Sequence, residues 1–206
     1  MVKENISRFF PIILLIFHVI GIYLFLNDDN GASLTWMNIV LCGLLLFLSE
    51  SYFKSAFYVL VFIALGGYLI ELIGTKTGYL FGDYWYETVL GWRLFDVPLI
   101  IGINWYAIVL SSANVARFVK TPIILQSTLA GVLCVFMDFV IEPIAIQYNF
   151  WEWQGNEIPF FNYVTWFAFA SLFAYIYLKT SSKLNKTAAW LYVIWILFFG
   201  LLNALV

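Results

Sequence analysis

Long apolar runs separated by short polar segments make up most of the chain. Each of seven runs is near the length of about 20 residues that a helix needs to cross the hydrocarbon core of a bilayer, although the second is short. The pattern predicts an all-α integral membrane protein, a bundle of about seven transmembrane helices that forms one polytopic membrane domain over residues 1–206. The runs cover residues 9–26, 34–48, 55–73, 97–116, 122–141, 161–178 and 188–206.

The composition excludes an ordinary soluble domain. Hydrophobic residues make up 64% of the chain and charged residues 11%, with a mean hydropathy of +0.93, whereas soluble domains carry about 25% charged residues. The 10 Lys and Arg against 12 Asp and Glu give a net charge of -2, which is too balanced to indicate a nucleic-acid partner. Membrane lipid is the expected surrounding of this chain.

The positive charges predict how the bundle is oriented, because Lys and Arg stay on the cytoplasmic side and acidic residues count for little. With the N-terminus in the cytoplasm, eight Lys and Arg fall on cytoplasmic segments and only Lys76 and Arg93 on outer ones. The two longest loops, residues 74–96 and 142–160, then both lie outside. We expect such a protein in the cytoplasmic membrane of a prokaryotic cell. The eight cytoplasmic charges are Lys3, Arg8, Lys54, Arg117, Lys120, Lys179, Lys183 and Lys186.

Histidine and cysteine are too few for metal or redox chemistry. Cys42 and Cys134 both lie within apolar runs and far apart in the chain, so neither a disulfide framework nor a CxxC site is expected. His18 is the only histidine, which excludes bis-His haem ligation and paired ExxH motifs. We expect His18 to lie on a helix face with a local partner rather than to carry protons. No metal and no cofactor are predicted.

Three acidic residues lie near the outer ends of apolar runs. Glu71 ends the third run, where an acid is costly unless it faces protein or water, so we expect it to face inward. Asp138 and Glu142 are four residues apart on the fifth run, which places them on one helix face together with Cys134. Two carboxylates this close repel each other, which favours a protonated acid that can donate its proton. Pro143 is expected to end this helix.

The surroundings of these acids allow two interpretations. The acids could pair with Lys76, Arg93 or tyrosine hydroxyls and only hold helices together. Alternatively, aromatic residues could line an apolar cavity beside them, with interfacial anchoring explaining part of the set. Gly74, Gly78 and Gly82 recur among polar neighbours, which predicts turns or a re-entrant segment rather than a GxxxG dimer face. The aromatic residues are Tyr79, Tyr84, Trp85, Tyr86, Trp92, Trp105, Tyr148, Phe150, Trp151, Trp153 and Trp166.

An ordered series of short motifs runs through residues 55–180. The motifs are Glu71-x-x-Gly74-x-x-Thr77-Gly78-x-x-Phe81-Gly82-x-Tyr84-x-Tyr86, Val97-Pro98 with Trp105, Asp138-x-x-x-Glu142-Pro143, Trp151-x-Trp153 and Pro159-x-x-Asn162-x-x-x-Trp166. Each motif is weak alone, but their order and spacing together are fairly specific. The series resembles the carotenoid biosynthesis membrane family, which includes the carotenoid 1,2-hydratases and the bisanhydrobacterioruberin hydratases.

The resemblance implies a cofactor-independent hydro-lyase whose carotenoid substrate comes from the bilayer. Such an enzyme adds water to the terminal C1=C2 bond of an acyclic ψ-end, of the γ-carotene, lycopene or bisanhydrobacterioruberin type. Protonation would give a tertiary cation that water captures, and aromatic faces stabilise a cation. We expect Asp138 to be the acid and Glu142 or Glu71 the base, with Asn162 and Tyr84 positioning water. The expected substrate-binding residues are Tyr84, Tyr86, Trp105, Trp151, Trp153, Asn162 and Trp166.

Two other functions stay open on the sequence. Intramembrane carboxylates also serve as proton carriers in proton-coupled transporters, which would place acids near mid-membrane in several helices. A carotenoid-binding membrane protein without catalysis would need a cavity but no paired acids. A retinal protein is not expected, because the last run, residues 188–206, contains no lysine for a Schiff base.

Overall fold

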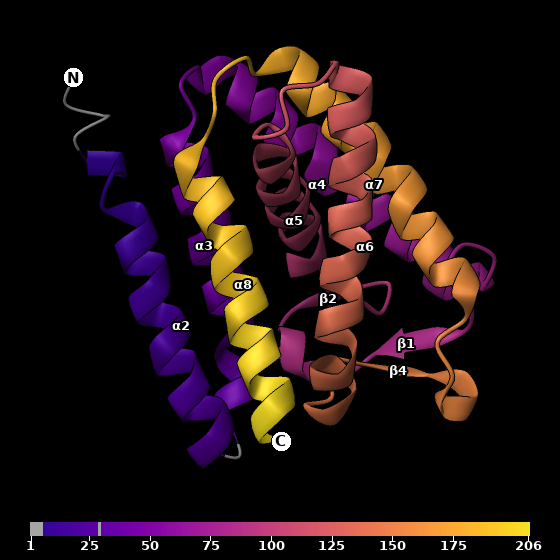
Figure 1. Ribbon diagram of the computed structural model, residues 1–206. Coiled ribbons are helices and arrows are strands. Elements are labelled where there is room, and N and C mark those ends of the chain that lie inside the picture. Colours follow the sequence, from indigo (N-terminus) through magenta and orange to yellow (C-terminus); the bar gives the residue numbers. More distant parts are fainter. Residues whose placement is uncertain (1–5, 29) are drawn as a thin grey trace.

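The computed structural model describes residues 6–28 and 30–206, so Lys3 of the charge count lies outside the described residues. Seven long helices dominate this part of the chain, and six are long and apolar enough to cross a membrane. The seventh, α5, is apolar but has only 17 residues. The predicted all-α membrane bundle is confirmed (Figure 1). The helices are α2 (Phe10–Asn27), α3 (Thr35–Ser49), α4 (Phe53–Thr77), α5 (Ile100–Ala116), α6 (Ile123–Gln147), α7 (Phe160–Thr180) and α8 (Lys186–Leu205).

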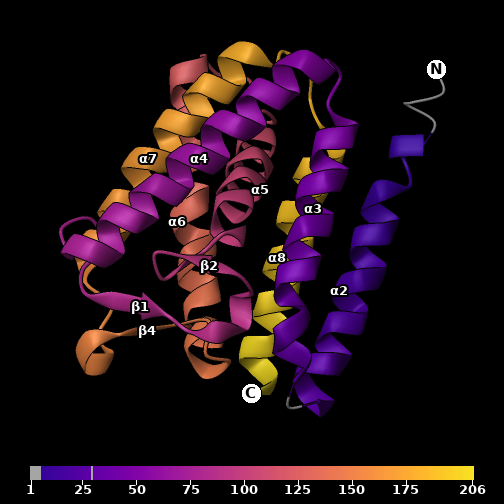
Figure 2. The same cartoon turned by 180° about the vertical axis from the view of Figure 1, so that it is seen from behind.

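Helix α5 forms the centre of the bundle. It packs against α3, α4, α6, α7 and α8, and two opposite views place it between its neighbours (Figure 1, Figure 2). A side chain at Gly102 would meet the backbone oxygen of Ala64 at 2.5 Å, so α4 and α5 approach closely there. A helix that is apolar on every side belongs in the core. Helix α5 is therefore the scaffold against which the other helices position their polar residues.

The outer helices carry large apolar side chains on the surface of the bundle. Phe17 on α2 is 49% exposed and Phe57 on α4 is 51% exposed. In a membrane protein such side chains form the lipid-facing surface. Helix α2 lies at one edge of the bundle, where it packs against α8 and α3 (Figure 1).

A short antiparallel sheet joins the two long loops at one end of the bundle. Strand β1 (Tyr84–Tyr86) of the first loop pairs with strand β4 (Trp151–Trp153) of the second. The register places the two tyrosines of β1 opposite the two tryptophans of β4. The expectation that both loops lie at the same end is confirmed (Figure 1). That this end faces the outside of the cell stays a prediction from the charges.

A second small sheet follows β1 along the first loop. Strands β2 (Arg93–Leu94) and β3 (Val97–Pro98) form a hairpin that turns at Phe95 and Asp96. Both turn residues have positive φ, 51° and 69°, as a two-residue hairpin turn matched to the strand twist requires. The first residues of the fourth apolar run thus form a strand, and helix begins only at Ile100.

The expectation that Pro143 ends α6 is wrong, because the helix continues to Gln147. The proline removes one backbone donor, a loss that helices packed among others in a membrane tolerate. Glu142 therefore keeps its helical position one turn beyond Asp138, on the same face.

The expectation of turns or a re-entrant segment at Gly74, Gly78 and Gly82 is only partly correct. Helix α4 extends to Thr77 and includes Gly74, where a side chain would collide with the ring of Phe81. Gly78 ends the helix in the left-handed conformation, with φ of 68°. Gly82 also has positive φ, and a side chain there would meet Pro159 at 2.5 Å. The segment is a helix end followed by a turn, and it does not re-enter the bundle.

Candidate active site

Glu71 lies in the last turns of α4 and is 3% exposed, so it faces inward as expected. The hydroxyls of Tyr84 and Tyr86 donate to its Oε2 atom, the latter at 2.8 Å. The indole nitrogen of Trp105 donates to Oε1 at 2.8 Å. Neutral donors from β1 and α5 thus fix the position of this carboxylate with three hydrogen bonds.

Strand β1 presents both tyrosines to Glu71 because alternate residues of a strand face the same side. Tyr84 and Tyr86 are buried, whereas Trp85 between them is 46% exposed. Burial and the neighbouring charge of Glu71 raise the pKa of both tyrosine hydroxyls well above the usual range. Both hydroxyls therefore stay protonated donors at neutral pH.

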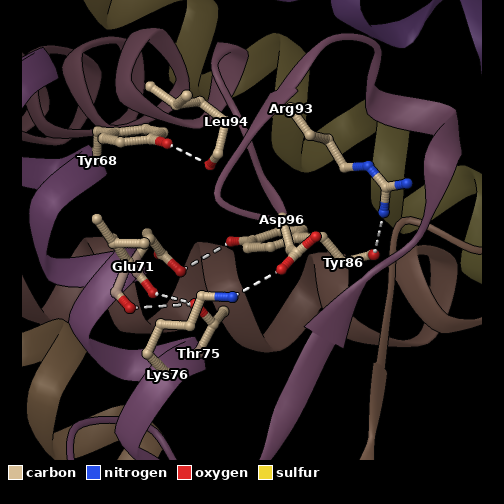
Figure 3. A network of polar contacts seen from close by, with 9 residues as sticks. Tyr68, Glu71, Thr75, Lys76, Tyr86, Arg93, Leu94 and Asp96 are labelled. Carbon is tan, nitrogen blue, oxygen red and sulfur yellow. Dashed lines mark hydrogen bonds and ion pairs between the residues drawn. The ribbon is translucent and has the colours of Figure 1, made fainter.

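The β2–β3 hairpin holds β1 against α4 (Figure 3). Arg93 Nη1 donates to the backbone oxygen of Tyr86 at 3.2 Å. On the other side of the hairpin, the hydroxyl of Tyr68 on α4 donates to the backbone oxygen of Leu94 at 2.6 Å. The hairpin therefore supports a residue that binds Glu71, although it does not touch the acid itself.

Lys76, in the last turn of α4, and Arg93, in the first loop, do not neutralise the buried acids. Lys76 pairs with Asp96 at 2.7 Å, and both side chains are largely exposed. This hydrogen bond and the positive charge of Lys76 hold the pKa of Asp96 below its usual range. Arg93 binds a backbone oxygen instead. The interpretation that the acids pair with Lys76 or Arg93 is wrong, whereas tyrosine hydroxyls do bind Glu71.

Asp138 lies on α6 and is 4% exposed. Asn162, in the first turn of α7, donates from Nδ2 to Asp138 Oδ2 at 2.8 Å. Within the described residues the Asp138 carboxyl accepts no other hydrogen bond. It is therefore the least supported of the three acids.

Glu142 follows Asp138 by one turn and is 2% exposed. The indole nitrogens of Trp151 and Trp153 both donate to its Oε2 atom, at 3.0 and 3.1 Å. These tryptophans are alternate residues of β4 and so face the same side. The β1–β4 sheet thus supplies two donors to Glu71 and two to Glu142.

All three acids line one small cavity of about 30 Å³. A water molecule needs about 10–15 Å³ of such space and two to four polar partners, so this cavity has room for one or two waters. Every predicted site residue except Trp105 contributes to its wall. The lining residues are Glu71, Phe81, Tyr84, Tyr86, Ile101, Asn104, Asp138, Glu142, Trp151, Trp153, Asn162 and Trp166.

A larger and mainly apolar cavity of about 270 Å³ adjoins the small one. Side chains of α2, α3, α5, α6 and α8 form most of its wall. Among the three acids, only Asp138 lines both cavities. The residues shared by the two cavities are Ile101, Asn104, Asp138, Trp151 and Trp166.

The wall of the large cavity includes residues of α2 and α3 that are exposed on the surface of the bundle. They include Phe17 and Ile20 on α2, which are 49% and 48% exposed, and Met37 on α3, which is 50% exposed. This side of the large cavity therefore lies next to the lipid-facing surface of α2 and α3.

Trp105 and Trp166 stack in parallel, with ring centroids 3.9 Å apart and an interplanar angle of 7°. Trp166 lines both cavities, whereas Trp105 lines neither and lies fully buried against Glu71. A side chain at Gly67 would collide with the Trp105 ring, so α4 also packs against it. Trp105 supports Trp166 and Glu71 from behind.

His18 lies in the wall of the large cavity and has the expected local partner. Its Nδ1 atom donates to the backbone oxygen of Leu14 at 2.7 Å. Its Nε2 atom accepts from the indole nitrogen of Trp195 at 3.0 Å and from Asn38 at 3.3 Å; these partners assign the tautomer. The single histidine thus ties α2 to α3 and α8.

Sequence reasoning missed Asn104, which lines both cavities, and the partners Asn38 and Trp195 of the histidine. The signal that points to the asparagines is a polar residue inside an apolar helix, where it is costly unless it faces protein or a cavity. No cluster of His, Cys, Asp or Glu suited to a metal ion occurs among residues 6–28 and 30–206.

The fold and the site define an integral membrane protein with a buried carboxylate cluster beside an apolar cavity. Residues 31–206 match the family described as "Carotenoid biosynthesis protein", and the chain belongs to this family. The match extends beyond residues 55–180, where the motifs lie, and includes α3 and α8. The predicted family is confirmed.

One curated relative is the bisanhydrobacterioruberin hydratase of Haloarcula japonica, which is 32% identical to the chain over 123 residues. The aligned part covers 55% of this chain and 41% of the relative, so the match spans about two fifths of the relative's length. No solved structure matches the chain.

Proposed function

We propose that this protein is a carotenoid hydratase that adds water to the terminal C1=C2 bond of an acyclic ψ-end. The observation that carries the proposal is the shared wall of the two cavities: Asp138 lines both a small space bordered by three acids and the neighbouring apolar cavity. An alkene in the large cavity and a water in the small one would meet at this acid. Membership of the family and the named activity of the relative support the same reaction.

The reaction begins with transfer of a proton from the Asp138 carboxyl to C2 of the alkene. The π electrons form the new C–H bond and leave a tertiary cation at C1. A lone pair of water then forms the C1–O bond, and a glutamate takes the released proton. The overall change is the addition of H and OH from one water, with the hydrogen delivered through Asp138, so the reaction needs no oxidant or reductant. Proton return to Asp138 completes the cycle.

The hydrogen bonds distribute these roles among the acids. Asp138 has one hydrogen-bond donor and faces both cavities, which suits a proton donor that must reach an apolar substrate. Glu71 accepts three hydrogen bonds and Glu142 accepts two, which suits groups that stay acceptors. Both glutamates face the small cavity, where either can take the proton of the attacking water.

Aromatic faces in the shared wall stabilise the cation. Trp151 and Trp166 line both cavities, and each ring contributes roughly 0.5–2 kcal/mol toward a nearby cation, more when water is excluded. Because Trp105 lies behind Trp166, its part is to hold that ring and Glu71 in place.

The substrate enters from the bilayer between α2 and α3, in the cytoplasmic membrane of a prokaryotic cell. The large cavity, at about 270 Å³, is just below the range of about 300–1,000 Å³ typical of ligand cavities. It fits the end of a polyene, while the rest of the polyene stays between these helices or in lipid. Substrates of the γ-carotene, lycopene or bisanhydrobacterioruberin type all offer such an end.

Pigment analysis in a lycopene-accumulating host tests the proposal. Anaerobic growth in H₂¹⁸O should give a more polar carotenoid that carries one ¹⁸O for each hydroxyl group. A product that forms only with O₂, or pigments that stay unchanged while the protein is present in the membrane, would contradict it. Unchanged pigments are the result expected of a transporter or of a carotenoid-binding protein.

A further inference from the structure

Asn104 lies at the boundary between the two cavities. It is on α5, one helical turn from Ile101 and from Ile108, and all three line the large cavity. Asn104 and Ile101 also line the small cavity of the acids. The amide therefore faces the region where an alkene and a water would meet.

The side chain of Asn104 has no hydrogen-bond partner among the described residues. Three other asparagines of the bundle differ in this respect. Asn114 binds Tyr177, Asn162 binds Asp138, and Asn185 binds Glu50. Asn104 is partly buried, and its amide lines both cavities without a protein partner, which leaves it available to bind a small polar molecule there.

The two residues expected from the sequence to position water are already engaged. Asn162 donates to Asp138, and Tyr84 donates to Glu71. Both line the small cavity but use their donors to hold acids. Asn104 is the amide in this wall that keeps both its oxygen and its NH₂ group for a small polar molecule.

We propose that Asn104 positions the water that captures the cation, an inference that rests on the proposed hydration. The amide oxygen accepts one hydrogen of the water, and a glutamate accepts the other. This leaves an oxygen lone pair directed at C1 across the cavity boundary. When the lone pair attacks, the second hydrogen passes to the glutamate as a proton.

The fate of the cation distinguishes a role of Asn104 in water capture from a purely structural role. A cation that water does not capture loses a proton instead and returns to an alkene. In D₂O the deuteron added at C2 then stays in part of the recovered alkene. The ratio of deuterium in recovered substrate to hydrated product measures water capture, whatever the amount of folded protein.

The experiment uses membranes that contain the full chain, D₂O buffer and lycopene as the probe. Asn104→Leu keeps the size of the side chain and removes both polar groups; Asn104→Ala, which adds no bulk, is measured beside it. We expect the ratio of deuterium in recovered substrate to hydrated product to rise about five- to tenfold in both variants, because the capture step loses one hydrogen bond. Asn38→Leu changes an asparagine that lines only the large cavity and should keep the wild-type ratio even if turnover falls.

Two results would overturn the inference. The wild-type ratio could persist in both Asn104 variants, because deuterium exchange and hydration are unchanged or fall together, or Asn38→Leu could raise the ratio equally. Each would mean that Asn104 has no specific effect on water capture. A wild-type protein that forms no hydrated product would instead reject the proposed function, and so the two failures are distinguishable.

Discussion

Buried acids lie near both ends of α4, and the two ends use them differently. At the end of the paired loops, Glu71, Asp138 and Glu142 surround a cavity. Near the opposite end, Glu50 caps the end of α3, three residues before α4 begins at Phe53, and is 6% exposed. Its Oε1 atom accepts hydrogen bonds from Tyr177 and from Asn185, both at 2.8 Å.

The network around Glu50 extends to several helices. Ser181 donates to Glu50 Oε2 at 3.2 Å, and Asn114 on α5 donates to the Tyr177 hydroxyl at 2.9 Å. The backbone nitrogen of Asn185 donates to Asn114 Oδ1 at 2.8 Å. The cavity beside this network has only about 10 Å³. Glu50 therefore joins the ends of α3, α5, α7 and α8.

The comparison shows that burial alone does not mark a functional acid in this protein. Glu50 is nearly as buried as the other three, but the cavity that it lines has only about 10 Å³ and shares no lining residue with the large apolar cavity. Asp138 has one donor and faces two cavities. Space for reactants beside an acid distinguishes the candidate active site from the structural network.

The largest expected effect on rate is at Glu142. Glu142→Gln keeps the shape and can still receive the indole hydrogen bonds, but it cannot take a proton from water. Hydration per folded molecule should fall about 10²- to 10⁴-fold, the usual contribution of a general acid or base. Carotenoid turnover by membranes that contain equal amounts of folded protein measures this. Glu71→Gln should lose most of its activity as well, and near wild-type turnover in both variants would reject the site.

At Glu50 we expect a loss of stability rather than a loss of rate. Glu50→Ala leaves the donors of Tyr177, Asn185 and Ser181 without their acceptor, and each unsatisfied buried group costs about 1–3 kcal/mol. We expect about 3 kcal/mol or more of lost stability, with turnover per folded molecule unchanged. Thermal unfolding in detergent measures the loss. An unchanged melting temperature would show that this network does not hold the helices together.

A moderate effect is expected from the aromatic wall. Trp166→Phe keeps a ring but weakens the cation–π interaction, and Trp166→Leu removes it, so each step should lower turnover about five- to tenfold. Trp190 on α8 is 55% exposed and serves as the lipid-facing control. Trp105→Phe removes the donor to Glu71 and should also lower turnover. Equal and small effects at all three tryptophans would contradict a cation-stabilising wall.

The smallest effect is expected at the exposed pair of Asp96 and Lys76. Because the pKa of Asp96 is lowered beside Lys76, the pair stabilises the fold at neutral pH, and this contribution is lost as the pH falls toward that pKa. The pair is exposed, so Asp96→Asn should change turnover less than twofold and stability only slightly. A pH series of melting temperatures checks this. A large loss of turnover would show that the hairpin transmits more to Tyr86 than its contacts indicate.

Apolar run lengths predicted the helices well because lipid-spanning segments must be long and apolar throughout. Helix-breaking residues were poorer guides to where the helices end. Pro143 and Gly74 each suggest an end, but α6 continues to Gln147 and α4 continues to Thr77. The pairing of β1 with β4 joins segments about 65 residues apart in the sequence and depends on how the helices bring the loops together. Local pattern contains no information of that kind.

The candidate site, like the fold, could be predicted only in part from the sequence. The acids were visible from the sequence because carboxylates are rare in apolar runs, and the structure brings all three into one wall. Asn104 and Trp105 are adjacent in sequence, but one faces the cavities and the other lies behind Trp166. The orientation of α5 about its own axis determines which of the two side chains faces the cavities, and composition does not reveal this orientation.

The most direct test of the central claim compares Asp138→Asn with Glu50→Gln. Both replace a buried carboxyl by an amide of the same shape, one beside the cavities and one in the network that joins the helices. Incorporation of ¹⁸O from water into lycopene, per folded molecule, should fall at least about 100-fold in Asp138→Asn and stay within about twofold of wild type in Glu50→Gln. Near wild-type incorporation in Asp138→Asn, or an equal loss in both variants, would contradict the assignment of catalysis to the cavity acids.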